Sequence, residues 1–187
     1  NSNAYSLSVT VVAASAKMTP NELTRAWLTK PLGMNDSRWI ERRQAKISPP
    51  EANKLGFATT ARDLARFGLM VLARGRWNDE TVLGDQDYLQ AALSPSQKMN
   101  PAYGYLWWLN GHKATLPGLR RDRGPLNPAA PDDLVAALGA LGRKCYVVPS
   151  LDLVVVRLGD SPEVIGQPKF DVEFWSQLMK AAPKKQR

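Results

Sequence analysis

The feature that most constrains the fold is a pair of β-rich runs in the last third of the sequence. Cys145 to Val148 and Leu153 to Leu158 are separated by four residues that begin with Pro149. Two such runs joined by a short turn predict an antiparallel hairpin. Three successive valines, residues 154–156, are typical of a strand that is covered on both faces. We therefore expect this hairpin to form the core and to lie inside a sheet rather than at its rim.

Two glycines, Gly139 and Gly142, precede the hairpin. A glycine in such a place permits a bulge or tight bend that has no chemical role. It also permits a ligand or a second backbone to approach closely, because no β-carbon is in the way. The residues alone leave both interpretations open.

Length and composition predict one globular piece with a sizeable core, since the chain has 187 residues of which 44% are hydrophobic. The single cysteine, Cys145, cannot form an internal disulfide, and we expect a buried small side chain. The net charge is +8, with basic runs at 120–123 and 184–187. No exposed aromatic residues alternate with these runs and no nucleic-acid motif accompanies them, so we predict solvated surfaces and no nucleic-acid partner.

No apolar run approaches the roughly 18 residues that a membrane-spanning helix needs, so no membrane span is predicted. The sequence opens at Asn1 with neither a methionine nor a signal peptide, which suggests a start inside a longer polypeptide. The only histidine, His112, has no second ligand nearby in the sequence and is expected in an exposed loop. We therefore predict neither a metal site nor a cofactor.

The N-terminal segment, Asn1 to Lys17, starts with N-cap residues and continues with small and apolar ones, which predicts a buried helix. Its valines lower helix propensity, so a strand remains the alternative. A second helix is expected over residues 20–29, because Thr19 suits an N-cap and Pro20 suits the first helical position. Its apolar face is predicted to contain Leu23, Ala26 and Trp27.

A third helix is expected to start after Thr60 and to end at Gly75. Thr60 and Asp63 have capping-box spacing. Arg62 and Asp63 are interpreted as a charge pairing at the helix start rather than as catalytic residues. The inward stripe of this helix is predicted to contain Leu64, Phe67, Val71 and Leu72.

Further elements are expected in the second half of the chain. A short helix is predicted over 85–93 and a strand over 103–110, with Trp107 and Trp108 on opposite faces. Core packing is the simplest role for these aromatic residues, and one face is a candidate wall for a substrate cleft. The proline-rich stretch up to Asp133 predicts a long surface loop. A C-terminal helix over 170–182 is predicted to turn inward Val172, Trp175, Leu178 and Met179.

Several of these stretches have amino-acid sequences similar to those of one superfamily. Pro-Leu-Gly-Met at 31–34, Thr-Ala-Arg-Asp-Leu-Ala-Arg-Phe-Gly at 60–68, the aromatic run at 103–108 and the hairpin resemble the serine β-lactamase and penicillin-binding-protein superfamily. The branch is the one that holds class C β-lactamases, esterases and nylon-oligomer hydrolases. The resemblance runs from Asn1 to Ala182 but covers only the C-terminal portion of a family member.

The resemblance implies an α+β, β-lactamase-like fold, in which helices flank an antiparallel sheet. Residues 1–187 would be the C-terminal part of one such domain. It would have a helical part at about 1–100, the sheet strands and last helix at about 101–182, and a basic tail at 183–187. The resemblance also favours a periplasmic or secreted location, whereas the chain itself does not indicate a compartment.

In this superfamily a Lys-Thr-Gly or His-Thr-Gly triplet, or a degenerate Gly-x-His-Gly-Gln form, borders the active site. Here Ala137, Leu138 and Gly139 fall on the triplet and 139–143 falls on the degenerate form, so that only the glycines match. What the resemblance implies is a backbone role, with the Ala140 amide as one donor to the oxyanion. The implied substrate-contacting residues are Ser2, Trp107, Gly139, Leu141, Gly142 and Arg143.

Ser2 enters because the family opens a helix here with Tyr-x-Asn or Tyr-x-Ser. Aligning Tyr5 and Leu7 with the family pattern puts Ser2 on the third position and the tyrosine immediately before Asn1. A register one residue later puts Asn1 in the place of the tyrosine and Asn3 on the third position. In either register this chain lacks the catalytic tyrosine.

The family mechanism also needs a serine in Ser-x-x-Lys, which this sequence does not contain: Ser15 precedes Lys17 by two, and Ser94 precedes Lys98 by four. One functional class is therefore the C-terminal portion of a serine hydrolase that acts on a small ester, amide or peptide substrate. Its partner would be an N-terminal segment of the same protein that carries Ser-x-x-Lys and the tyrosine. The other class is a non-catalytic binding or structural protein. The residues upstream of Asn1 discriminate between the two.

Overall fold

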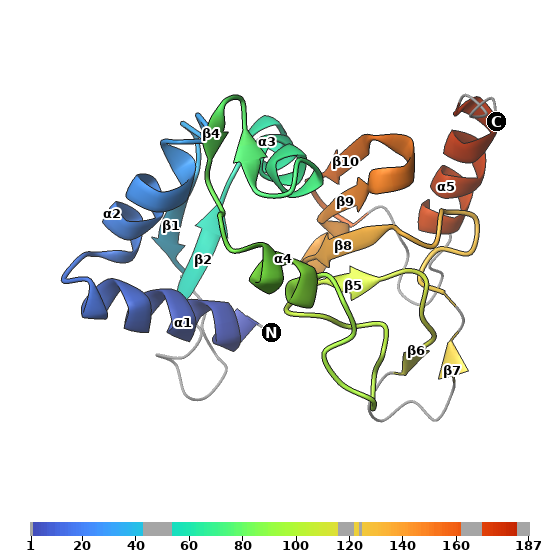
Figure 1. The fold of residues 1–187 in the computed structure, drawn as a ribbon, viewed down its shortest axis with the longest axis horizontal. Helices are drawn as coiled ribbons and strands as arrows, with labels where there is room; N and C mark the ends of the chain where they lie inside the picture. The colour runs from blue at the N-terminus through green and yellow to red at the C-terminus, as the bar shows by residue number, and fades with distance from the viewer. Residues whose placement is uncertain (1, 43–53, 116–121, 124, 162–169, 183–187) are drawn as a thin grey trace. The chain divides into compact units, whose positions relative to one another are not determined.

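The computed structural model describes residues 2–42, 54–115, 122–123, 125–161 and 170–182 (Figure 1). The chain is α+β, as the sequence predicts, and its sheets are antiparallel. It divides into two compact units, Asn1–Gly84 and Asp85–Arg187. Each unit is described by itself below.

The described residues of the first unit form three helical regions and two small sheets. The helices are α1 (Ser2–Ser15), α2 (Pro20–Thr24), which continues as the π-helix η1 (Arg25–Thr29), and α3 (Ala61–Leu72). Strand β1 (Arg38–Glu41) pairs with β2 (Leu55–Ala58), and β3 (Arg76–Trp77) pairs with β4 (Glu80–Thr81).

The predicted N-terminal helix is confirmed as α1, but the expectation that it is buried is wrong. Leu7, Val11 and Val12 are exposed, Val11 by 62%. Only Ser6 and Ala13 are buried among its described residues, and the Ser6 hydroxyl accepts a hydrogen bond from the Leu55 N–H at 3.2 Å. Helix α1 packs against α2 and β2, and the side chains that point away from them stay exposed.

The start of α2 agrees with the sequence. The Thr19 hydroxyl accepts from the Glu22 N–H, the Glu22 carboxylate accepts from the Thr19 N–H, and Pro20 takes the first helical position. Leu23 is buried as predicted, whereas Ala26 and Trp27 are exposed, Trp27 by 59%. The reason is the change to a π-helix after Thr24, which rotates the later side chains away from the face that a continuous α-helix would present.

Helix α3 also starts and stops where the sequence indicates. The Asp63 N–H donates to the Thr60 hydroxyl at 3.3 Å. Gly75 adopts φ +86° and donates its N–H to the Met70 carbonyl at 2.8 Å, which closes the helix. The predicted stripe is only partly buried: Val71 is buried, and Leu64, Phe67 and Leu72 are half-buried.

The second unit is built on a four-stranded antiparallel sheet. The strand order is β10 (Leu153–Arg157), β9 (Lys144–Val148), β8 (Val135–Leu138) and β5 (Trp108–Leu109). Helix α4 (Gln86–Ala92) precedes the sheet, with Asp85 as its N-cap, and α5 (Phe170–Ala181) follows it. A two-residue pair, β6 (Ala114–Thr115) with β7 (Asp122–Arg123), lies within the stretch predicted as loop.

The predicted hairpin is confirmed as β9 and β10, with Val148 opposite Leu153. Its predicted place inside the sheet is right for β9 only. All five residues of β9 are buried because the strand has a neighbour on each side, whereas β10 is the last strand of the described sheet and its five residues are half-buried.

The strand expected over 103–110 is wrong except at its end. Only Trp108–Leu109 forms a strand, and Tyr103 makes a single bridge to Trp108. Leu106 adopts φ 64°, and the Gly104 N–H donates to the Trp107 carbonyl at 2.8 Å, so that the chain turns back on itself. Alternating aromatic residues predict a strand, but a tight turn interrupts it.

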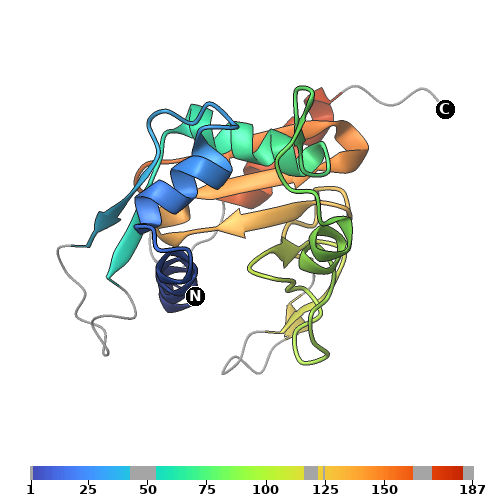
Figure 2. The same cartoon turned by 60° about the vertical axis from the view of Figure 1, so that its left-hand side comes forward.

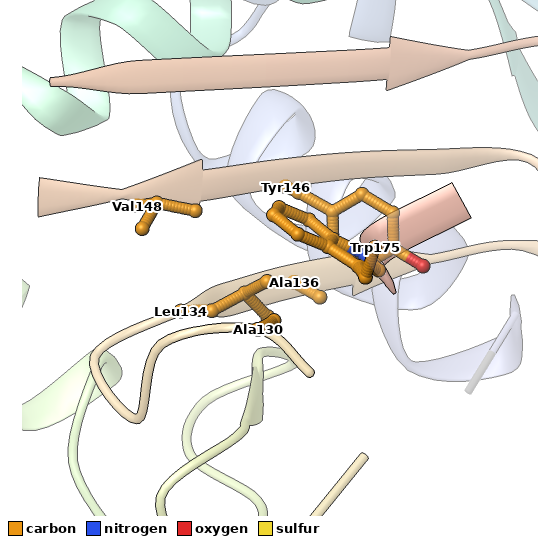
Figure 3. Packing of buried hydrophobic residues seen from close by; sticks show 6 residues of the cluster. All are labelled: Ala130, Leu134, Ala136, Tyr146, Val148 and Trp175. Atoms are coloured by element: carbon orange, nitrogen blue, oxygen red, sulfur yellow. The ribbon is translucent and has the colours of Figure 1, made fainter. Parts of the chain in front are cut away.

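The core of the second unit lies between the sheet and α5 (Figures 1–3). Trp175 is completely buried, and its ring meets that of Tyr146 edge-on with centroids 5.3 Å apart. The inward face of α5 runs through Phe174, Trp175, Leu178 and Met179. Val172, which was predicted to face inward, is 50% exposed because it lies to one side of this stripe.

The stretch before β8 is anchored by Asn110, a residue that pattern analysis does not single out. Its side-chain amide donates to the carbonyls of Asn127, Ala130 and Pro131 at 3.1, 3.3 and 2.9 Å. Its amide oxygen accepts from the Asn127 N–H at 2.7 Å. The described part of the predicted loop is therefore fixed to the sheet by one fully buried side chain.

Candidate functional site

Five of the seven candidate site residues form the tip of one hairpin. Residues 139–143 join β8 to β9 through a single 3₁₀ turn, Ala140–Gly142. The Gly139 N–H donates to the Arg143 carbonyl at 2.8 Å, and the Arg143 N–H donates to the Ala140 carbonyl at 3.3 Å. Leu141 and Gly142 both have positive φ, at 60° and 69°. A tight bend, one of the two interpretations that the sequence leaves open, is therefore present.

The two glycines of this turn differ in whether the backbone conformation requires a glycine. Gly142 lies in the left-handed region, which favours glycine. Gly139 has φ −110°, and a β-carbon added to it would lie 3.5 Å from the Arg143 β-carbon, an ordinary contact. A β-carbon would therefore fit at position 139, and the turn itself does not require a glycine there.

Ala140, which the resemblance implies as an oxyanion donor, lies at the tip of the hairpin. Ala140 is exposed and is the first residue of the 3₁₀ turn, where an N–H has no partner within the turn. Among the described residues no acceptor for this N–H is seen. A free, fixed backbone donor on a hairpin tip is what an oxyanion contact needs.

Arg157, which the sequence analysis did not select, holds this turn from β10. Its guanidinium donates to the carbonyls of Gly142 at 2.9 Å and Leu141 at 3.4 Å, and also to the Asp160 carbonyl. Its Cζ lies 5.4 Å from the centroid of the Phe170 ring. The only feature of the sequence that could have indicated this role is a basic residue at the end of an apolar strand. Such residues are also common on strand edges that face solvent.

A buried polar cluster lies behind the turn. Lys144, the first residue of β9, is 8% exposed and forms an ion pair with Asp171 of α5. Burial raises the pKa of the Tyr146 hydroxyl, and the Asp171 charge adds to this shift. Burial also raises the pKa of the Cys145 thiol to about 12. Cys145 is a buried core side chain, as predicted.

The two remaining candidates lie elsewhere. Trp107 is in the second unit, in the loop before β5, and is 8% exposed, so its ring belongs mainly to the core. Ser2 is the first residue of α1 in the first unit. Its side chain lies outside the described side chains. The structure therefore groups the five hairpin residues within the second unit.

The described ranges also contain titratable side chains outside the turn at 139–143. They contain no group of three or more His, Cys, Asp or Glu side chains that suits a metal ion, and His112 is exposed. None of their helices combines the length and the apolar character needed to cross a membrane.

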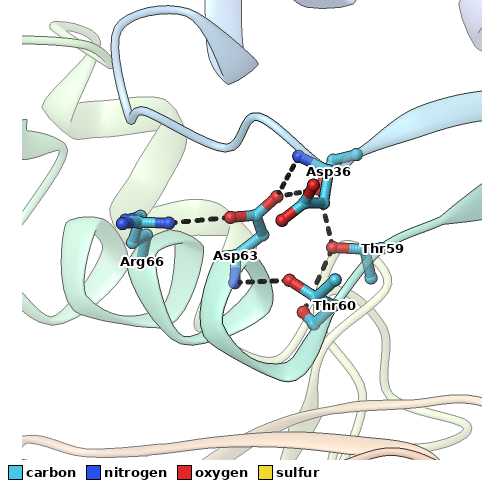
Figure 4. A network of polar contacts seen from close by, with 6 residues as sticks. Asp36, Thr59, Thr60, Asp63 and Arg66 are labelled. Atoms are coloured by element: carbon cyan, nitrogen blue, oxygen red, sulfur yellow. Dashed lines mark hydrogen bonds and ion pairs between the residues drawn. The ribbon is translucent and has the colours of Figure 1, made fainter.

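Asp63 is a structural carboxylate rather than a catalytic one (Figure 4). It is 1% exposed and accepts hydrogen bonds from the Asp36 N–H and the Ser37 hydroxyl, both at 2.9 Å. Its charged partner is Arg66 at 2.8 Å, not Arg62 as its neighbour in sequence suggested. The carboxylate thus ties the start of α3 to the segment before β1.

Comparison with known proteins identifies the fold. No protein-family model and no curated protein sequence matches the chain. A class C β-lactamase of known structure superimposes with a TM-score of 0.60 at 15% identity, over 97% of this chain and 56% of that one. A β-lactamase from Mycobacterium bovis gives a TM-score of 0.56 at 18% identity, over 94% of this chain and 61% of that one.

The fold is β-lactamase-like. The predicted α+β class and the predicted resemblance are therefore confirmed at the level of fold. The chain spans only 56% and 61% of the two β-lactamases that it matches.

Proposed function

We propose that this chain is the C-terminal portion of a β-lactamase-related serine hydrolase. The observation that carries the proposal is that nearly the whole chain adopts the β-lactamase-like fold while spanning little more than half of a β-lactamase. The sequence itself contains no Ser-x-x-Lys. The nucleophilic serine, its lysine and the tyrosine would then lie on an N-terminal segment of the same protein.

The proposed reaction is acyl transfer from a small ester, amide or peptide. The serine oxygen attacks the carbonyl carbon, the lysine and the tyrosine transfer the proton to the leaving group, and water then hydrolyses the acyl-enzyme. In the tetrahedral intermediate the carbonyl oxygen carries a negative charge. The Ala140 N–H would donate to this oxygen, and Arg157 would hold the turn in place.

The other candidate residues have supporting roles in this proposal. Gly139, Leu141, Gly142 and Arg143, which form the turn with Ala140, would contact the substrate. Trp107 and Ser2 remain proposed contacts, Ser2 as the third residue of the Tyr-x-Ser element.

A non-catalytic binding or structural protein is the second candidate. It is favoured by the side chains of Ala137 and Leu138, which replace the polar residues of the family triplet. The upstream sequence separates the two: a tyrosine directly before Asn1 and a Ser-x-x-Lys further back support the hydrolase.

The decisive experiment compares Ala140→Pro with Ala140→Ser in the polypeptide extended upstream to include Ser-x-x-Lys. Proline fits the first position of a helical turn but removes the N–H, whereas serine keeps it. We expect the proline variant to lose about a hundredfold to a thousandfold in turnover of a nitrophenyl ester and the serine variant to stay close to wild type. If circular dichroism shows both variants folded and the proline variant turns over normally, Ala140 is not the donor.

A further inference from the structure

A cavity of about 210 Å³ lies in the first unit, between the α2–η1 helix and the segment that leads into β1. The residues that line it include the cationic Arg25, Lys30 and Arg38, and also Asn21 and Asn35. No carboxylate is among its lining residues. The proposed hydrolase reaction uses none of these residues.

The three cations have no counter-charge of their own in the described structure. Arg25, Lys30 and Arg38 are exposed, and no ion pair or side-chain hydrogen bond of theirs is seen among the described residues. Like charges that share a cavity wall repel one another, and a bound anion removes this repulsion.

The neighbouring carboxylates do not fill this role. Glu22 accepts from the Thr19 N–H, and Asp63 is occupied by Arg66, Ser37 and the Asp36 N–H. The Asp36 carboxylate is exposed beside Asn35 but does not line the cavity.

The π-helix is what brings two of the cations together. The Lys30 N–H donates to the Arg25 carbonyl at 3.0 Å, so these residues lie one helical turn apart. In an α-helix, residues five apart point about 140° away from each other. π-helical turns are rare and are often found at functional sites.

The carbonyls at the end of this helix do not repel an anion strongly, because they already accept hydrogen bonds. The Leu28, Thr29 and Lys30 carbonyls accept from the N–H groups of Leu32, Met34 and Gly33, at 3.1, 2.8 and 3.1 Å. The partial negative charge of the helix end is therefore largely satisfied by the chain itself.

The wall that carries Arg38 is fixed in place. The Asn21 side chain donates to the Trp39 carbonyl at 3.1 Å and accepts from the Trp39 N–H at 2.7 Å. The Thr24 hydroxyl accepts from the Trp39 indole N–H at 2.7 Å. Strand β1, including Arg38, is thus pinned against the helix that carries Arg25.

We propose that this cavity is a binding site for a phosphate group. Two guanidinium groups provide the paired, planar donors that suit phosphate oxygens, Lys30 adds a point charge and the Asn35 amide adds a neutral donor. The net charge of +8 favours the encounter with an anion. The phosphate can come from the free ion or from a phosphate monoester, and both carry the same charged oxygens.

Calorimetric titration of the protein with inorganic phosphate, at low ionic strength and pH 7.5, tests the proposal. We expect saturable binding at one site per chain, and at least tenfold weaker binding in Arg25→Gln and in Arg38→Gln. Arg62→Gln is the matched control, since Arg62 is an exposed arginine of the same unit that lies outside the cavity. It removes the same charge and should bind phosphate like wild type.

A parallel titration with glycerol phosphate distinguishes the two sources. Tighter binding than inorganic phosphate identifies a phosphate ester as the ligand, and weaker binding identifies the free ion. The proposal is overturned if wild-type protein shows no saturable binding at millimolar phosphate, or if Arg62→Gln weakens binding as much as Arg25→Gln does. Because Arg25 and Arg38 are exposed, neither substitution should disturb folding. Ester turnover by the extended polypeptide should be unchanged, which separates this site from the proposed hydrolase.

Discussion

At the scale of single residues, Asp63 shows what local sequence can and cannot reveal. Its place at the start of α3 follows from its spacing to Thr60, and the capping contact is present. Its other partners, Asp36 and Ser37, lie 27 and 26 positions earlier in the chain. Such contacts depend on how the chain returns to the helix, so a local pattern cannot predict them.

We predict that Asp63→Asn lowers the free energy of unfolding by about 2 kcal/mol. The amide keeps the size of the carboxylate, but it leaves Arg66 without its partner and weakens the bonds from the Asp36 N–H and the Ser37 hydroxyl. Urea unfolding followed by tryptophan fluorescence measures the change. Asp79→Asn, at an exposed position of the same unit, is the control and should stay within about 0.5 kcal/mol of wild type.

Because of Cys145, we expect the free energy of unfolding to fall as the pH becomes alkaline. Burial raises its pKa from 9.0 to about 12, so the fold favours the neutral thiol. Its contribution is complete below pH 9 and is lost as the pH rises, because the unfolded chain releases the proton first. Between pH 8 and 10 this group should remove about 1.4 kcal/mol from the free energy of unfolding.

Urea unfolding of wild type and Cys145→Ala at both pH values isolates this contribution. Every other ionisable group is common to both proteins, so its effect cancels in the comparison. The difference in stability between the two proteins should shrink by about 1.4 kcal/mol from pH 8 to pH 10. An unchanged difference would mean that the thiol ionises as easily in the fold as in the unfolded chain.

At the scale of elements, the sequence predicts where helices begin and end better than it predicts which side chains are exposed. The capping residues of α2 and α3 are where the sequence places them, and α4 lies within the predicted range 85–93. The exposure of Trp27 and the turn within 103–108 were missed. A capping contact joins residues within one helical turn, so the local sequence predicts it. The π-helix at 25–29 and the turn within 103–108 depend on contacts with other elements, such as α4, and the spacing of apolar residues carries no information about these contacts.

Gly75 and Gly33 allow steric crowding to be separated from backbone strain. Both have positive φ, at 86° and 65°. A β-carbon at Gly75 would lie 2.1 Å from the Leu83 carbonyl oxygen, whereas at Gly33 it would meet nothing within 4 Å. We predict that Gly33→Ala costs about 1 kcal/mol, the strain alone, and that Gly75→Ala costs at least about 3 kcal/mol because the backbone must move.

Thermal and urea unfolding of the two variants test this difference. Equal losses of stability would show that the β3–β4 segment yields without cost and that strain dominates at both positions. Since both glycines lie in the first unit, the comparison does not depend on how the two units are arranged.

At the scale of the whole molecule, the sequence predicted the fold class through short motifs spread over the chain. Those motifs are turns and caps, which remain recognisable at low overall identity. The candidate site was predicted less completely. The turn at 139–143 was located, but Arg157 was missed because it contacts the turn only through the β9–β10 pairing.

The last prediction concerns β10, whose outer edge has no partner among the described strands. Leu153 and Val155 pack toward the core, so Val154 and Val156 point to the opposite face, where they are only half-buried. A half-covered valine strand at a sheet edge can pair with another chain. We therefore propose that the N-terminal segment of the same protein covers this strand, and that residues 1–187 alone associate and melt over a broad temperature range.

Val154→Lys distinguishes this proposal from a self-sufficient fold. A lysine on an edge strand blocks pairing between chains, so it should reduce the association of residues 1–187, as measured by size-exclusion chromatography at several concentrations. In the extended polypeptide the same lysine would be buried, and it should lower the melting temperature by several degrees. A sharp, concentration-independent melt of monomeric 1–187, unaffected by the lysine, would show that the chain needs no partner segment.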